Sequence, residues 1–369
     1  MIENSALIVD KKAVIDNTEL LRSNLNPNTK IISVIKANGY GLGLVQVAEL
    51  CEEMGIDILA VLDVEQARDL REAGIKSPIL LLGAVLEDNF KYLIEYDLIQ
   101  VIINHEYALK MNEYALEHGV KIKTHVKHDT GLNRLGMRDY DEIKSCYFLE
   151  GLDVQGIYTH FTASQSYDPD DVAFSHLQIK TFNDVLDRLR SEDIDVGMTH
   201  MQNSPSILQF GDLGYDAVRC GMVMFGLFHP SQRQIAYDAG YRSVISFETH
   251  ICMVRDLHKG DAVGYSRSYR VEETMRVATL STGYCDGIMR SLSVNGGGVV
   301  VNGVLCPILG DIAMSQFMID VTNVDCKLED KAIVFGHELQ SVYETIDLTG
   351  QTINEFISHL RYDLKRIYR

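Results

Sequence analysis

The chain lacks the signatures of several protein classes. Its seven cysteines are odd in number and scattered through 369 residues, and no CxxC pair occurs. Such a set predicts neither a disulfide framework nor a zinc ribbon, so we expect no metal site. The first residues, MIENSALIVDKK, lack the basic start and apolar run of a signal peptide. No apolar run approaches the ~20 residues of a membrane-spanning helix.

Positive charge is also scarce. The 34 Lys and Arg residues face 52 Asp and Glu residues, which gives a formal net charge of −18. A general nucleic-acid binder would carry a basic stripe, so nucleic acid is not an expected partner. The remaining composition, 46% hydrophobic and 23% charged, is typical of an ordinary soluble globular protein. We therefore expect a cytoplasmic protein without a membrane partner.

Short apolar runs alternate with helical patterns through the first 220 residues. Eight such units favour a closed (β/α)8 barrel of parallel strands over an open doubly wound sheet, because no GxGxxG occurs and eight strands suit closure. The expected strands are Ile31–Ile35, Ile58–Leu62, Ile79–Leu82, Ile99–Ile103, Ile122–Val126, Val154–Tyr158, Gly197–Met201 and Ala217–Val223.

After Gly226 the runs become short, β-rich and broken by glycines. This texture predicts a C-terminal, mostly antiparallel β domain, with helix returning only near Ile353–Leu360. The expected domains are 1–236 for the barrel and 237–369 for the β domain. Residues 1–10, which include a strand-like run, are candidates for packing with the second domain.

One stretch, Ile31–Gly43 (IISVIKANGYGLG), places a lysine where a strand gives way to a helix. Lys36 directly follows the apolar run, and Leu44, Val47, Ala48 and Cys51 then repeat at helical spacing. Ligands of parallel α/β folds bind at the carboxyl ends of strands. A lysine held there can form a Schiff base with a carbonyl group. Taken alone, a surface lysine in a glycine-rich loop is the commoner explanation.

Polar residues follow other strands of the expected barrel. They should share its carboxyl-terminal mouth with Lys36, and they are Lys127, His128, Arg134, His160, Asn203, Ser204, Arg219 and Gly221. Each has an ordinary alternative: His160 could be a core histidine, Arg219 an ion pair closing the barrel, and Asn203–Ser204 a helix cap. Together they indicate a site for an anionic cofactor and a carboxylate substrate.

At this point the motifs form a recognisable series. KANGYGLG, KHDTGLNRLG, YTHF, QNS, VRCGMVMFG, VGYSRSY, TGYCDG and GDIAMSQ occur in order over nearly the whole chain. The chain thereby resembles alanine racemase and related amino-acid racemases. That resemblance implies pyridoxal 5′-phosphate (PLP) as cofactor, a small amino-acid substrate, and a homodimer whose active sites are shared between subunits.

The resemblance also implies which residues bind the cofactor. Lys36 would carry PLP covalently, Arg219 would face its pyridine nitrogen, and His160 would lie against its ring. Since arginine stays protonated, Arg219 cannot give the nitrogen a proton. The expected contacts to the phosphate group come from Tyr40, Ser204, Tyr362 and the backbone near Gly221 and Met222.

Two bases on opposite faces of the substrate α-carbon are implied as well. Lys36 would serve one face and Tyr265 of the other subunit the second, with His160 and Arg219 as candidate cations that ease ionisation of the phenol. Arg134 would polarise the phenolic oxygen of PLP and bind the substrate carboxylate, which the Met314 amide would also hold. Tyr284 would line the entrance. Lys127 resembles a position that is carbamylated in many members.

Some positions depart from the family pattern. Gly39 and Leu42 stand where alanine and histidine are usual, and Asp311 and Ser315 replace an arginine and an aspartate. The usual Trp-Ala-Glu-Ile opening is absent, and the chain has no Trp. Asp311 exchanges charge near the entrance, which leaves serine or a broader substrate range open beside alanine. A related PLP decarboxylase and a non-catalytic PLP carrier are the further alternatives.

Overall fold

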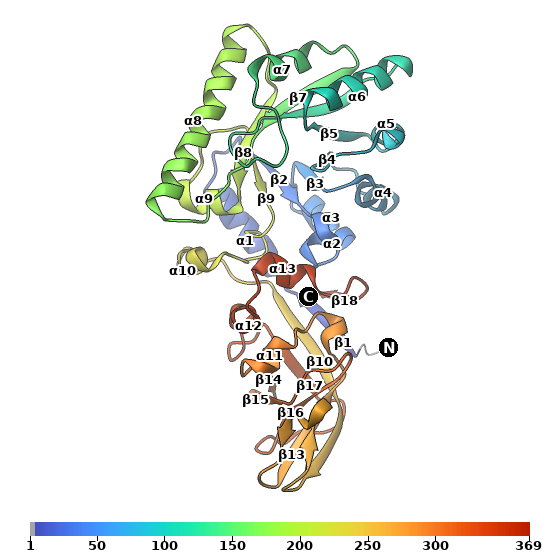
Figure 1. The fold of residues 1–369 in the computed structure, drawn as a ribbon, viewed down its shortest axis with the longest axis vertical. Helices are drawn as coiled ribbons and strands as arrows, with labels where there is room; N and C mark the ends of the chain where they lie inside the picture. The colour runs from blue at the N-terminus through green and yellow to red at the C-terminus, as the bar shows by residue number, and fades with distance from the viewer. Residues whose placement is uncertain (1–3) are drawn as a thin grey trace. The chain divides into compact units, whose positions relative to one another are not determined.

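The computed structural model describes residues 4–369, which form two compact units. One unit spans Ile15–Tyr241, and the other combines the described residues before Ile15 with Arg242–Arg369. Figure 1 colours the chain along its length, so the blue first strand can be found among the orange and red strands of the C-terminal unit.

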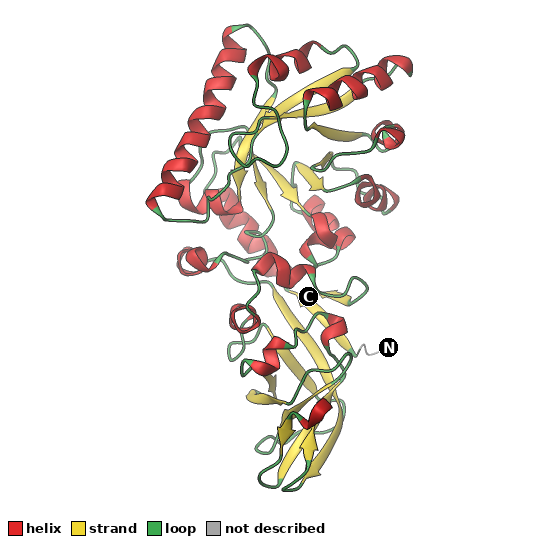
Figure 2. Ribbon diagram, viewed as in Figure 1, coloured by secondary structure: helices red, strands yellow, loops and turns green. Residues whose placement is uncertain are grey.

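The larger unit is the expected closed barrel. Its parallel strands pair in sequence order, and the last pairs with the first, for example Ile32 of β2 with Arg219 of β9. Figure 2 shows the yellow strands with red helices outside them. The predicted fold class is therefore confirmed. The strands are β2 Lys30–Val34, β3 Ile58–Val61, β4 Ile79–Leu81, β5 Leu98–Ile102, β6 Ile122–Lys127, β7 Leu152–Tyr158, β8 Met198–Asn203 and β9 Ala217–Cys220.

The helices of this unit follow the apolar patterns of the sequence. In α3 (Leu44–Glu53) the buried side chains include Leu44, Val47, Ala48 and Cys51, which repeat at the spacing expected for one helical face. The other helices are α1 Lys11–Ser23, α2 Lys36–Tyr40, α4 Val64–Glu72, α5 Lys91–Glu95, α6 His105–Glu117, α7 Tyr140–Ser145, α8 Pro169–Ser191, α9 Ser204–Phe210 and α10 Arg233–Ala239.

The barrel interior is apolar on one side and polar on the other. Ile32, Ile58, Leu80 and Val101 belong to its buried apolar cluster. Inward positions of β6, β8 and β9 instead carry His125, His200 and Arg219, each at most 4% exposed. Barrel interiors are usually filled by branched apolar residues, so this polar side needs internal hydrogen bonds.

The second unit is built on one mixed sheet of order β13-β16-β15-β14-β17-β10-β1-β18. Its long strand β10 (Ile245–Leu257) pairs antiparallel with β1 (Ser5–Val9), which itself pairs parallel with β18. The other strands of this sheet are β13 Met275–Leu280, β14 Gly298–Val301, β15 Val304–Leu309, β16 Phe317–Asp320, β17 Lys331–Phe335 and β18 Lys365–Tyr368. A separate two-stranded sheet is formed by β11 Ala262–Val263 and β12 Tyr269–Arg270.

The expectation that helix returns only near Ile353–Leu360 is wrong. Two helices, α11 (Ser291–Val294) and α12 (Val342–Thr349), precede α13 (Ile353–Ser358). The sequence held a signal for α12, because Ser341 and Glu344 form a reciprocal capping box. Within residues 4–369, no helix combines the length and apolar character needed to span a bilayer.

Candidate active site

Lys36 begins a strained turn at the carboxyl end of β2. Ala37, Asn38, Gly39 and Tyr40 all have positive φ, between 53° and 62°, so the chain makes a left-handed turn before α3 begins. The Asn38 side chain accepts the Leu44 amide and ties this turn to that helix. Left-handed backbone costs roughly 1–2 kcal/mol per non-glycine residue, and such strain concentrates at functional sites.

Four cationic side chains gather at the carboxyl-terminal mouth of the barrel: Lys36, Lys127, Arg134 and Arg219. Burial, followed by the Arg134 charge, lowers the pKa of Lys36. Burial, then Arg134 and Arg219, lowers the pKa of Lys127 to about 8. No carboxylate of the described residues forms an ion pair with any of these four side chains. The mouth is therefore suited to more than one anionic group.

Arg219 is the best-fixed member of this cluster. Its guanidinium donates to His200 Nδ1 at 2.7 Å, to His160 Nδ1 at 2.9 Å and to the carbonyls of Thr159, Met201 and His200. Burial lowers its pKa to about 10, which still leaves it protonated near neutral pH. Among residues 4–369, Arg219 forms no ion pair, so the alternative that it closes the barrel through an ion pair is wrong.

His160 is held neutral by this contact. A guanidinium only donates, so Nδ1 of His160 must accept and its proton sits on Nε2. Burial and then Arg219 lower the pKa of His160 well below its usual value. His160 is thus a neutral donor through Nε2, and the expectation that it contributes a cation is wrong.

A narrow cradle forms where β9 ends. Ser204 Oγ accepts the Gly221 amide at 3.2 Å, and a side chain at Gly221 would lie 2.8 Å from the Tyr40 ring and 2.9 Å from the Val34 carbonyl. Met222 follows Gly221 directly. The helix-cap alternative is confirmed for Asn203, which caps α9 and leaves the Ser204 hydroxyl for this cradle.

Arg134 sits on a loop organised by Asp129. The Asp129 carboxylate accepts the amides of Gly131 and Asn133 and the Nε of Arg138. Burial acts to raise the pKa of Asp129, but these hydrogen bonds outweigh it and hold the pKa below its usual value. Asp129 is therefore a positioning residue for the Arg134 loop that the sequence reading missed.

The remaining expected residues lie in the second unit. Tyr265 and Met314 are 74% and 60% exposed, so neither is an ordinary core residue. Ser266 and Arg267 have positive φ after Gly264, so the Tyr265 turn is strained like the Lys36 turn. The amides of Tyr284 and Cys285 bond the carbonyls of Ala313 and Met314, which fastens the Tyr284 turn beside Met314.

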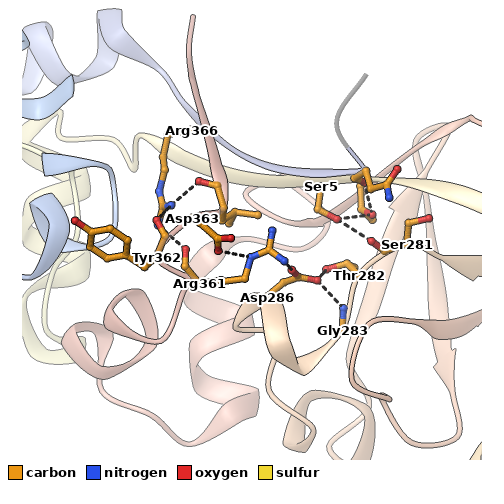
Figure 3. Close-up of polar contacts among 12 residues, drawn as sticks. Ser5, Ser281, Thr282, Gly283, Asp286, Arg361, Tyr362, Asp363 and Arg366 are labelled. Carbon is orange, nitrogen blue, oxygen red and sulfur yellow. Dashed lines mark hydrogen bonds and ion pairs between the residues drawn. The ribbon is translucent and has the colours of Figure 1, made fainter. Parts of the chain in front are cut away.

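Tyr362 lies beside a set of contacts centred on Asp286, the Asp286 clamp, which is drawn in Figure 3. Asp286, which is 4% exposed, accepts from Thr282 Oγ1 and the Gly283 amide and forms an ion pair with Arg361 at 3.1 Å. Arg361 directly precedes Tyr362. The Tyr284 turn and the Tyr362 segment are thereby fastened together within this unit.

One expected member of the mouth lies elsewhere. His128 is buried against Phe182 of α8, with ring centroids 6.4 Å apart, so the expectation that it reaches the mouth is wrong. Successive strand residues point to opposite faces, and Lys127 already faces the interior Tyr158 ring. The same alternation could have revealed His125 and His200 as inward residues, which the sequence reading missed.

Comparison with known proteins decides the family. The model of the alanine racemase N-terminal domain matches residues 9–229, and that of the C-terminal domain matches residues 244–368. The chain belongs to the alanine racemase family. The alanine racemase of Halothermothrix orenii is 34% identical over 368 residues, which cover 98% of this chain and 96% of that protein.

Solved structures agree with this assignment. The alanine racemase of Clostridium difficile 630 matches with a TM-score of 0.93 and 27% identity, over all of this chain and 96% of its own. The structure from Bartonella henselae, described as an alanine racemase with covalently bound pyridoxal phosphate, matches with a TM-score of 0.85 at 24% identity over both full chains. The expectation of a racemase-type isomerase is confirmed at the level of the family.

Proposed function

We propose that this chain interconverts L-alanine and D-alanine with PLP as its cofactor. The observation that carries the proposal is the cluster of Lys36, Arg134 and Arg219, none of which pairs with a carboxylate of residues 4–369. A phosphate dianion and a substrate carboxylate would supply the missing negative charge. The cradle at Gly221, too narrow for a side chain, suits a close approach of backbone amides to phosphate.

The residues present fit PLP. Lys36 would hold it covalently, Arg219 would face the pyridine nitrogen, and Tyr40, Ser204, Gly221, Met222 and Tyr362 would hold the phosphate. When bound, PLP supplies an electron sink that acidifies the α-hydrogen of the attached amino acid. Arg219 is already committed as a donor and keeps its proton, which limits that sink and disfavours transamination.

Two proton-transfer groups are needed on opposite faces of the α-carbon. Lys36 has a lowered pKa, so a larger fraction of its amine is neutral and able to accept a proton. We assign the second face to Tyr265 of another copy of the chain, and therefore propose a homodimer. His160 Nε2–H is a suitable donor to stabilise the phenolate. Arg134 and the Met314 amide would hold the substrate carboxylate, with Tyr284 at the entrance.

Lys127 would act as a carbamate. Its pKa of about 8 leaves part of the amine neutral, and this amine can attack CO2 to form a C–N bond while a proton leaves to solvent. The resulting anion would orient Arg134. Incubation with 13C-bicarbonate should give a carbamate signal that Lys127→Gln removes; an unchanged signal would contradict this role.

All seven cysteines are free, which suits the reducing cytoplasm we propose.

Tyr265→Phe tests the two-base assignment. The variant should keep PLP bound, judged by its absorbance, and lose about 100-fold or more of racemisation in both directions. Tyr269→Phe, four residues further along the chain at the start of β12, is the matched control and should stay active. Full racemisation by Tyr265→Phe would remove Tyr265 from the mechanism.

Lys36→Ala tests the covalent attachment of PLP. The variant should leave no PLP on the chain after borohydride reduction and mass analysis.

Substrate choice separates the alternatives. Asp311 pairs with Arg290 at 3.3 Å, so the exchanged charge is partly neutralised and alanine remains the expected substrate. A panel of alanine, serine and lysine in deuterated water should show the fastest solvent deuterium entry at the alanine α-carbon. Faster serine turnover would favour the broader-specificity alternative, released CO2 would favour a decarboxylase, and PLP binding without exchange would favour a carrier.

A further inference from the structure

The polar side of the barrel contains a hydrogen-bonded chain whose direction can be assigned. Arg219 Nη1 donates to His200 Nδ1, so the remaining proton of neutral His200 lies on Nε2. That Nε2 is 2.9 Å from His125 Nδ1, which must therefore accept. The proton of neutral His125 is then on its Nε2. The donors point away from Arg219, towards the opposite end of the barrel.

His125 ends this chain at a cavity. A cavity of about 320 Å³ at the amino-terminal mouth is lined by His125 and by residues at the starts of several strands. Along β6, Lys127, His125 and Lys123 face inward at alternate positions, so Lys123 reaches this mouth and Lys127 the other. His125 is 1% exposed, and no described residue accepts a hydrogen bond from its Nε2. Because His125 lines the cavity, a ligand or water there can supply the acceptor for this donor.

The charge around this cavity is positive, although the whole chain carries −18. Its lining holds the four cations Lys30, Arg71, Lys76 and Lys123, and the two carboxylates Asp57 and Asp97. Lys123 pairs with Asp97 at 2.6 Å. Arg71 is fixed by the carbonyls of Tyr96, Ile75 and Ser77. No described carboxylate pairs with the Lys30 or Lys76 ammonium group.

We propose that this amino-terminal cavity binds a phosphate-type dianion, with His125 Nε2–H as its neutral donor and the exposed Lys30 and Lys76 as its cations. The excess of two positive charges matches a dianion. The site is distinct from the carboxyl-terminal mouth and does not depend on racemisation. Because His125 accepts from His200, which accepts from Arg219, a bound anion would strengthen the whole chain of hydrogen bonds.

The test uses the PLP-loaded protein, so that inorganic phosphate cannot occupy the cofactor's own phosphate position. Calorimetric titration with inorganic phosphate should show one site per chain. Lys30→Gln with Lys76→Gln should weaken it about tenfold or more, because each lysine supplies a charge-assisted contact. Lys180→Gln, an exposed lysine on α8, removes the same charge elsewhere and should leave the affinity unchanged.

Further arms decide the ligand chemistry and the role of His125. The acetate heat that Lys30→Gln with Lys76→Gln removes reports binding in this cavity, and it should correspond to an affinity at least tenfold weaker than that of phosphate; equal affinity would overturn the preference for a dianion. His125→Gln should lose phosphate affinity while the folded protein keeps its PLP absorbance. No phosphate heat, or equal weakening by Lys180→Gln, would overturn the site. None of these outcomes bears on racemisation, so failure here and failure of the proposed function are distinguishable.

Discussion

At the scale of single residues, the left-handed turn after Lys36 makes the clearest demands on side chains. Gly39 has a φ of 62°, and a Cβ there would lie 2.9 Å from Cγ2 of Val47. Asn38 offsets part of its own strain because its side chain caps α3. Gly39 thus avoids left-handed strain and a close contact with Val47 in this chain, although alanine is usual at this position in the family.

Gly39→Ala should lower the free energy of unfolding by about 1–3 kcal/mol, from left-handed strain plus the contact with Val47. Adding Val47→Ala removes the contact but not the strain, so the double variant should lose less than the two single losses combined. Denaturant unfolding of the three variants gives this coupling. Additive losses would show that Val47 is not the obstacle.

At the scale of elements, turns and segments are fastened by single buried carboxylates. Asp129 gathers two amides and Arg138 to shape the Arg134 loop, and Asp286 joins the Tyr284 turn to the segment of Arg361 and Tyr362 (Figure 3). Each carboxylate serves several donors at once, so removing it would leave several polar groups unpaired.

Arg361→Gln should therefore loosen both elements that Asp286 joins. We expect a loss of about 1–3 kcal/mol in unfolding free energy, because Asp286 is buried and would lose its charged partner. PLP affinity should fall too if Tyr362 holds the phosphate, as proposed. Asp363→Asn is the control, since Asp363 also pairs with Arg361 but its side chain is 79% exposed. Equal stability of Arg361→Gln and wild type would contradict the clamp.

At the scale of the whole molecule, three neutral histidines make folding sensitive to acid. Burial, followed by the Arg219 charge, lowers the pKa of His125 to about 4 and those of His160 and His200 well below their usual value. The unfolded chain therefore binds protons below about pH 6.5 that the folded chain does not. Their stabilising effect is complete above that pH and is lost as the pH falls towards 4.

Stability should fall by about 1.4 kcal/mol per pH unit for each such histidine between pH 6 and 4. The measurement is the free energy of unfolding in denaturant at several pH values. His125→Gln keeps an acceptor for His200. It should reduce the pH slope of the unfolding free energy by about 1.4 kcal/mol per pH unit, the contribution of one proton. His118→Gln, at an exposed position, should leave the slope unchanged. The same slope in both variants would mean that His125 is not neutral in the folded chain.

The sequence alone determined the barrel and the positions around Lys36, because both follow from local patterns. Eight apolar runs with helical stripes between them leave closure as the favourable arrangement, and a residue's place after a strand fixes the end of the barrel it reaches. The order of motifs identified the family for the same reason, since each motif is contiguous in the chain.

Only the tertiary structure decided the protonation and the partners of these residues. His160 is neutral because Arg219, 59 positions away, donates to it, and Asp286 matters because Arg361 reaches it from the end of the chain. Side chains alternate between the two faces of a strand, so His125 points inward and His128 outward only if Lys127 points inward. The structure shows that it does, because Lys127 lies over the Tyr158 ring inside the barrel. Hydrogen bonds and charges between distant segments depend on distances in space, and a linear pattern does not contain those distances.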